Sequence, residues 1–226
     1  NVGSPANQTC KKPDSPGHKV STVLNETPTG FPGQTLEQWK ADVMFWKGKN
    51  PEHISLYSLT VEDRTALKKW VKSKQVFLLE EEKVAEMFHW TSEFLEEHGW
   101  EHYEVSNFAR VGFRSQHNGN YWKGIPYLGI GPSAHGYDGE HRRWNPRNNV
   151  KYGKAWREGN GIWEEELLSE VDRFNELLMV RLRTAEGLPH SEVPSIFFPR
   201  LVRQWECIDG DYRLLESGKF RFSKAG

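Results

Sequence analysis

The stretch of the sequence with the most varied chemistry runs from His117 to Gly136. It holds two histidines and an adjacent aromatic pair: His117, His135, Tyr121 and Trp122. Glycine recurs in the same stretch, at Gly119, Gly129, Gly131 and Gly136. Neutral imidazoles can ligate a metal, flat aromatic rings can stack on a planar molecule, and glycine lets backbone come close to a ligand. These residue types together suit a porphyrin.

A purely structural interpretation of these residues stays open. In that interpretation the histidines cap turns, and Tyr121 and Trp122 fill a core. A lone histidine would favour it, whereas the clustering of four such residues favours a binding site.

A run rich in arginine follows the glycines. It includes Arg142, Arg143 and Arg147 beside Trp144. Guanidinium groups form paired contacts with carboxylates, such as the propionates of a porphyrin. Arg142 and Arg143 are therefore candidate propionate partners, and a solvated loop is the equal alternative.

The overall composition excludes little by itself. The 226 residues hold 30 Lys plus Arg against 31 Asp plus Glu, a net charge of -1. Nothing in that total draws the protein to nucleic acid or to anionic lipid, and we expect no nucleic-acid partner, although a balanced total allows local basic patches.

The two cysteines are Cys10 and Cys207, too far apart to indicate a zinc clip or a disulfide framework. No apolar run approaches the roughly 18 residues that span a bilayer, and no signal-like segment opens the sequence. We therefore expect a soluble, cytoplasmic protein.

The first half of the chain alternates short apolar runs with helical periods. Strands are expected at 20–24, 53–59 and 103–106. A helix should begin after Thr35 and bury one face, made of Leu36, Trp39, Val43 and Trp46. Residues 62–74 form a charged link to a second helix, which carries an apolar stripe and ends before Gly99: Val84, Met87, Phe88, Thr91 and Leu95.

This alternation predicts an α/β fold with right-handed crossovers and a parallel sheet, as in half of a βα barrel. Site residues would then follow the C-terminal ends of the strands. We expect an irregular lead-in over 1–19 and a partial barrel over 20–158.

A mostly helical domain is expected over 159–226. One amphipathic helix contains Phe174 and Leu178, a shorter one contains Leu201 and Trp205, and a hairpin turns at Asp209–Asp211. Two helices and a small β-wing resemble a winged-helix module. The helices are not conspicuously basic, so we expect packing or partner docking in place of DNA binding.

Five short motifs occur in the order seen in a known family. They begin at Gly30, His53, Tyr103, His117 and Gly131, and read GFPGQTLE, HISLYSLT, YEVSNFA, HNGNYW and GPSAH. Over roughly residues 30–226 the chain closely resembles the HemW family of heme chaperones, radical S-adenosylmethionine proteins long labelled as oxygen-independent coproporphyrinogen III oxidase-like enzymes.

The resemblance implies the second half of a radical-SAM-type partial barrel followed by the family's C-terminal helical domain. It also implies an N-terminal CxxxCxxC loop for a [4Fe-4S] cluster, which Cys10 and Cys207 do not supply. Glu26 aligns with an acidic residue that contacts S-adenosylmethionine, although Pro28 and Thr29 are poor residues for a central strand. Thr60 aligns near another contact to the same cofactor.

Three functions follow as alternatives. The first is heme binding and delivery, with His117 or His135 as an axial ligand. The second is radical chemistry on a porphyrinogen, for which this chain lacks the cluster ligands. The third is a non-catalytic module that docks on a heme recipient at the membrane. An unpaired sheet edge would also favour a homodimer.

Overall fold

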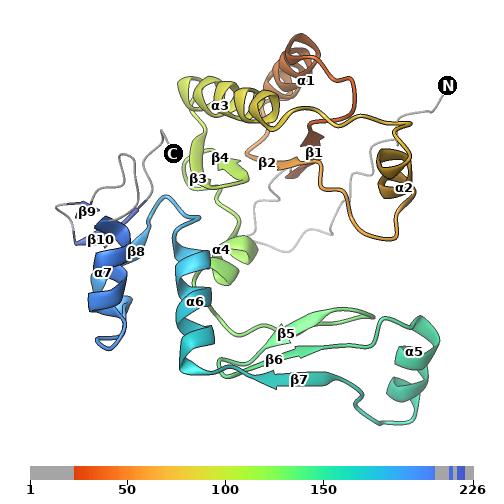
Figure 1. The fold of residues 1–226 in the computed structure, drawn as a ribbon, viewed down its shortest axis with the longest axis vertical. Helices are drawn as coiled ribbons and strands as arrows, with labels where there is room; N and C mark the ends of the chain where they lie inside the picture. The colour runs from red at the N-terminus through yellow and green to blue at the C-terminus, as the bar shows by residue number, and fades with distance from the viewer. Residues whose placement is uncertain (1–22, 207–213, 216–217, 222–226) are drawn as a thin grey trace, which may run out of the picture. The chain divides into compact units, whose positions relative to one another are not determined.

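The computed structural model describes residues 23–206, 214–215 and 218–221 (Figure 1). The expected lead-in over 1–19 and both cysteines lie outside these residues. The chain divides into two compact units. The first consists of Asn1–Glu101 and Phe108–Phe113, and the second of His102–Asn107 and Arg114–Gly226. The domain limits expected from the sequence remain a prediction.

A four-stranded sheet begins the fold. Its strands are β1 (Val23–Thr29), β2 (His53–Ser58), β3 (Glu101–Glu104) and β4 (Asn107–Ala109), in the order β1-β2-β4-β3. β1 and β2 pair in parallel, as predicted, with a register shift between Leu24 and Thr27. The prediction that the first strand ends at residue 24 was wrong. Because β1 is an edge strand of this sheet, Pro28 is accommodated within it.

Three helices belong to the first unit: α1 (Leu36–Lys49), α2 (Ala66–Lys72) and α3 (Glu81–Glu97). Thr35 caps α1, as the sequence indicated, and the structure adds a capping box with Gln38. The expected apolar faces are confirmed at Trp39, Val43, Met87 and Leu95, which share one core with residues of the sheet. The other expected members Trp46, Val84 and Phe88 are half-buried. Inside this core the Trp39 Nε1 donates a hydrogen bond to Thr91 Oγ1 at 2.7 Å.

Two expectations, one for each unit, need correction. The charged link over 62–74 contains α2, capped by Thr65, because a threonine cap and helix-favouring lysines suffice for two turns. The strand expected over 103–106 ends at Glu104, and β4 follows after two turn residues.

A second, antiparallel sheet lies in the second unit and was not anticipated. It consists of β5 (His135–Tyr137), β6 (His141–Trp144) and β7 (Glu164–Leu167), in that order. Helix α4 (Gln116–Trp122) precedes it, and α5 (Asn149–Arg157) connects β6 to β7. Three of the candidate residues lie on these short strands, His135 on β5 and Arg142 and Arg143 on β6, and three more lie on α4: His117, Tyr121 and Trp122.

The C-terminal part contains α6 (Glu170–Arg181), a short 3-10 helix (His190–Glu192) and α7 (Phe198–Glu206). A small sheet has the order β8 (Leu188–Pro189), β10 (Lys219–Phe220), β9 (Leu214–Leu215). Phe174, Leu201 and Trp205 are buried in one core, which confirms both predicted helices. The expected turn at Asp209–Asp211 lies outside the described residues.

The turn between β3 and β4 is tied to the segment after α6, within the second unit. Asn107 Nδ2 and the Ser106 backbone N–H both donate to Glu104 Oε1. The Val105 N–H donates to the Arg183 carbonyl at 2.9 Å. Burial raises the pKa of the Glu104 carboxyl, while the hydrogen bonds from Asn107 and Ser106 and the charge of Arg183 oppose the rise.

The raised pKa of Glu104 predicts a pH-dependent contribution to stability. The folded state keeps a proton that the unfolded state loses, so this contribution is present below the ordinary carboxyl pKa and is lost as pH rises through the folded-state pKa. We expect Glu104→Gln to become more stable relative to the parent as pH rises from 5 to 8. The gain should be about 1.4 kcal/mol for each tenfold by which folding strengthens proton binding to the carboxyl. Urea unfolding at several pH values measures this.

Glu97→Gln at the exposed end of α3 controls for loss of a carboxylate. A difference between Glu104→Gln and the parent that stays constant over this pH range contradicts the assignment.

Candidate functional site

Helix α4 places two of the candidate residues one turn apart. The Ser115 hydroxyl caps the helix by accepting from the Asn118 N–H at 3.2 Å. His117 and Tyr121 then lie at i and i+4, and their rings meet edge to face with centroids 4.9 Å apart. Both side chains are exposed, so this edge of α4 is accessible to a ligand.

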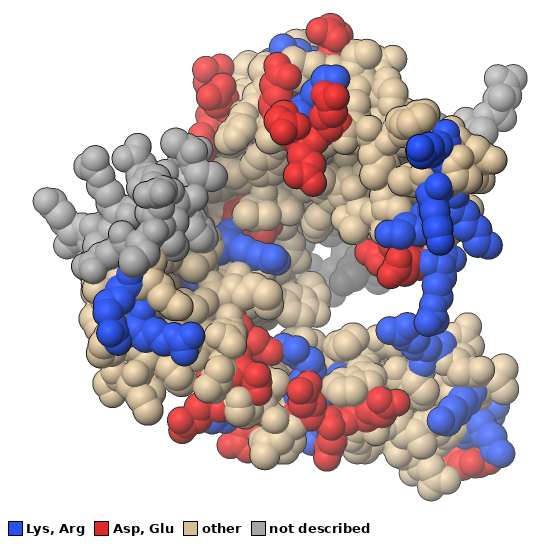
Figure 2. Space-filling model, in the orientation of Figure 1, with Lys and Arg blue, Asp and Glu red and all other residues tan. Residues whose placement is uncertain are grey.

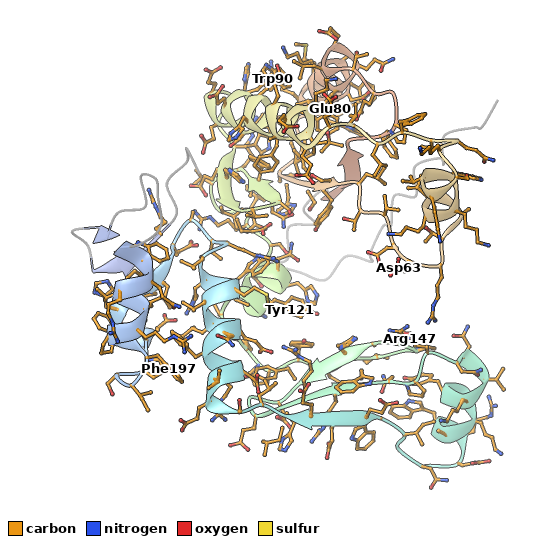
Figure 3. All side chains as sticks on the ribbon, in the orientation of Figure 1. Asp63, Glu80, Trp90, Tyr121, Arg147 and Phe197 are labelled. Carbon is orange, nitrogen blue, oxygen red and sulfur yellow. The ribbon has the colours of Figure 1, made fainter. Side chains whose placement is uncertain are left out.

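A row of rings continues from α4 to the sheet, and Tyr121 is labelled in Figure 3. The Tyr121 ring contacts Tyr127 at a centroid distance of 4.6 Å. Tyr127 exchanges backbone hydrogen bonds with Tyr137 of β5, at 2.8 and 2.9 Å. Burial raises the pKa of Tyr127, and the nearby Arg142 charge opposes the rise. We call His117, Tyr121, Tyr127 and Tyr137 the aromatic row.

The register of β5 against β6 places further candidates on one face. His135 is opposite Trp144, and Tyr137 is opposite Arg142. Directly paired residues of antiparallel strands project to the same side, and positions two apart share that side. The His135 and Trp144 rings lie 6.2 Å apart. His135, Tyr137, Arg142 and Trp144 therefore form one surface, which we call the His135 face.

Only one of the two candidate arginines, Arg142, lies on this face. Arg142 forms an ion pair with Glu176 of α6. Arg143, one position along β6, projects to the other side and pairs with Asp138 at 3.1 Å and Glu165 at 3.0 Å. Because a strand alternates sides at each residue, Arg142 and Arg143 do not converge on one ligand from the same face.

The glycine-rich loop before β5 packs against its own strand. A Cβ at Gly129 would overlap the carbonyl oxygen of His135. Asn145 Nδ2 donates to the carbonyls of Gly129 and Gly131, at 3.1 and 2.9 Å. The loop at Gly129 therefore packs closely against the backbone of β5, and this packing sets the position of His135.

Large apolar side chains flank that glycine and face solvent. Leu128 is 83% exposed and Ile130 is 79% exposed. The other member of the aromatic pair, Trp122, is half-buried, and its Nε1 has no hydrogen-bond partner among the described residues. Leu128 and Ile130 had not been singled out, because apolar residues in a loop give no signal in the sequence until their exposure is known.

The remaining candidates, Glu26 and Thr60, lie in the first unit. Glu26 falls in β1 where the register shifts, and Thr60 is exposed just after β2. Among the described residues, no three His, Cys, Asp or Glu side chains group as a metal site, and none of the helices is long and apolar enough to cross a membrane.

Comparison with known proteins places the chain in a family. No family model matches it. It is 31% identical over 171 residues to the heme chaperone HemW of Synechocystis and 37% identical over 158 residues to that of Lactococcus lactis. The chain belongs to the HemW-like family. It also shares 36% identity over 169 residues with the mitochondrial radical S-adenosyl methionine domain-containing protein 1 of Danio rerio.

The HemW alignments cover 74% and 70% of this chain but 42% and 41% of the relatives, so the chain spans less than half of their length. The Danio rerio alignment covers 71% of this chain and 38% of that protein. The solved structure of coproporphyrinogen III oxidase (HemN) from Escherichia coli matches with a TM-score of 0.58 at 18% identity. That match covers 85% of this chain and 45% of the other, and shows a shared α/β fold.

The [4Fe-4S] cluster implied by the family does not fit the cysteines of this chain. Three thiolates hold such a cluster in the family's motif, whereas the 226 residues contain two cysteines, 197 positions apart by their numbers, 10 and 207. We therefore derive no chemical step through a cluster from these residues.

Two glycines of the site region should respond oppositely to alanine. Gly129→Ala should lower the free energy of unfolding by about 1–3 kcal/mol, because the loop must shift away from β5. Gly119→Ala is the matched change in α4, where an added Cβ meets nothing within 4 Å, and it should raise stability by about 0.5–1 kcal/mol. Urea unfolding followed by circular dichroism measures both, and equal effects would contradict the close approach at Gly129.

Proposed function

We propose that this chain binds heme and passes it on, as a heme chaperone-like member of the HemW family. The observation that carries the proposal is the joining of the aromatic row to the His135 face within one compact unit. The relatives in Synechocystis and Lactococcus lactis are named heme chaperones, which supports the same cargo here.

Two histidines are the proposed iron ligands. His117 presents an exposed imidazole beside Tyr121, and His135 presents one beside Trp144. Either can coordinate heme iron through a ring nitrogen. The exposed Leu128 and Ile130 supply apolar surface for the macrocycle close to His135 in sequence, and Trp122 is a further proposed heme contact.

Arg142 is the better proposed partner for a propionate. It shares the His135 face, and its ion pair with Glu176 is partly exposed, with 36% and 25% of the two side chains accessible. A propionate can replace the Glu176 carboxylate with little net change in charge pairing. Arg143 projects to the opposite side of the sheet, so we propose a smaller contribution of Arg143 to propionate binding.

Delivery would use the C-terminal part. We propose that α6, α7 and the β8-β10-β9 sheet form a winged-helix-like module with its own core, which docks on a heme recipient at the membrane. A cytoplasmic location and a homodimer through the edge of the first sheet complete this proposal. Thr60, beyond the C-terminal end of β2, and Glu26 of β1 are the proposed contacts to S-adenosylmethionine.

Heme titration tests the ligands. Heme addition to the parent should shift the Soret band. Of His117→Ala and His135→Ala, the variant that removes the iron ligand should bind heme at least about tenfold more weakly. His89→Ala on the exposed side of α3 is the matched control and should titrate like the parent. If both site variants titrated like the control, the assigned ligands would be wrong.

A porphyrin ester tests the propionate contact. Arg142→Glu should weaken heme binding by about tenfold and leave binding of the heme dimethyl ester much less affected, because the ester lacks the propionate charges. Arg143→Glu makes the same charge change on the other side of β6 and should alter heme binding less. Equal losses for heme and its ester in Arg142→Glu would rule out the pairing.

A further inference from the structure

The segment from Arg64 to Leu79 concentrates positive charge. It contains Arg64, Lys68, Lys69, Lys72 and Lys74, and no Asp or Glu. Helix α2 lies within it, and blue side chains gather over this helix in Figure 2. We call the five basic residues, together with Trp70 and Phe77, the α2 surface. The charge is local, since the whole chain has a net charge of -1.

Helix α2 separates apolar from basic side chains. At about 100° per residue, Ala66, Leu67, Trp70 and Val71 fall on one side, and Lys68, Lys69 and Lys72 fall on the other. None of the residues of α2 is buried. Trp70 is 49% exposed, and Phe77 beyond the helix is 73% exposed. On the apolar side Ala66 and Trp70 are therefore open to solvent, and Leu67 and Val71 are half-buried.

Most of these charges are not neutralised within the part of the chain that the structure describes. Lys68 lies 3.5 Å from Asp63, with both side chains well exposed. Lys69, Lys72 and Lys74 form no ion pair with any described residue. By contrast, Arg142 and Arg143 of the second unit each pair with carboxylates of the chain. The α2 surface thus presents cations to solvent beside exposed aromatic rings.

We propose that the α2 surface docks on anionic phospholipid bilayers, lying in the headgroup region without crossing it. Lysines attract anionic headgroups, and Trp70 on the apolar side of α2, with the exposed Phe77 beyond the helix, can enter the interface, which is the composition of interfacial amphipathic helices. An acidic protein or a nucleic acid would satisfy the lysines and would leave the apolar side of α2 without a role. This inference does not depend on heme binding.

Vesicle flotation of the chain tests the docking. The chain should bind vesicles of phosphatidylcholine with roughly 30% phosphatidylglycerol, should bind pure phosphatidylcholine far less, and should be released by salt. The double variant Lys69→Glu, Lys72→Glu should lower the partition coefficient by at least about tenfold. Trp70→Ser should lower it several-fold, and Trp70→Phe should restore much of the loss.

The matched control is Lys47→Glu, Lys151→Glu, which makes the same change in net charge on α1 and α5. It should bind anionic vesicles nearly as the parent does, and circular dichroism should show all variants folded. Equal loss in the control, unchanged binding of the α2 double variant, or equal binding to neutral vesicles would each overturn the proposal. So would a Lys69- and Lys72-dependent preference for an RNA oligonucleotide or an acidic peptide over the vesicles.

Discussion

The register of β5 against β6 decides which side chains of the second unit meet. Tyr127 and Tyr137 hold one edge of β5 through paired backbone hydrogen bonds, and Gly129 allows its loop to lie against His135. A slip of one residue would turn every side chain of a strand to the other side of the sheet. His135, Tyr137, Arg142 and Trp144 share a face only because this register is kept.

The same register separates two roles for charge. On the His135 face, Arg142 pairs with Glu176 of α6, which joins the sheet to that helix. On the other side, Arg143 is fixed between Asp138 and Glu165, with its guanidinium near the Trp163 ring. A ligand carboxylate can replace the carboxylate of a partly exposed ion pair at a small net cost in free energy. Such exchange suits a cargo that must be released again, more than one that is permanently held.

Elements with a strong apolar period could be predicted from the sequence. Trp39 and Val43 in α1, and Met87, Thr91 and Leu95 in α3, recur at helical spacing and are buried as that spacing requires. Helix α2 was missed because its lysines resemble a solvated link. The strands β5 to β7 were missed because they are three or four residues long and rich in charge, as in the Glu164–Leu167 strand, so alternation gave no signal.

The candidate residues were chosen by type but could not be placed by sequence alone. His117 and Tyr121 contact each other because both lie on α4, which local spacing could have indicated. The contact of Tyr121 with Tyr127, and the separation of Arg142 from Arg143, depend on non-local pairing. Two adjacent arginines in a loop can contact one ligand, whereas in a strand their side chains project to opposite sides of the sheet. The sequence had not indicated that β6 is a strand.

In the function proposed for this chain, the aromatic row and the His135 face form one heme-binding surface. Two-dimensional NMR of the isotope-labelled chain, titrated with diamagnetic gallium protoporphyrin, tests it most directly. We expect the largest chemical-shift changes to fall together on signals of His117, Tyr121, Tyr137 and Arg142. Changes confined to α7 or to the first unit, with those four residues unchanged, would contradict it.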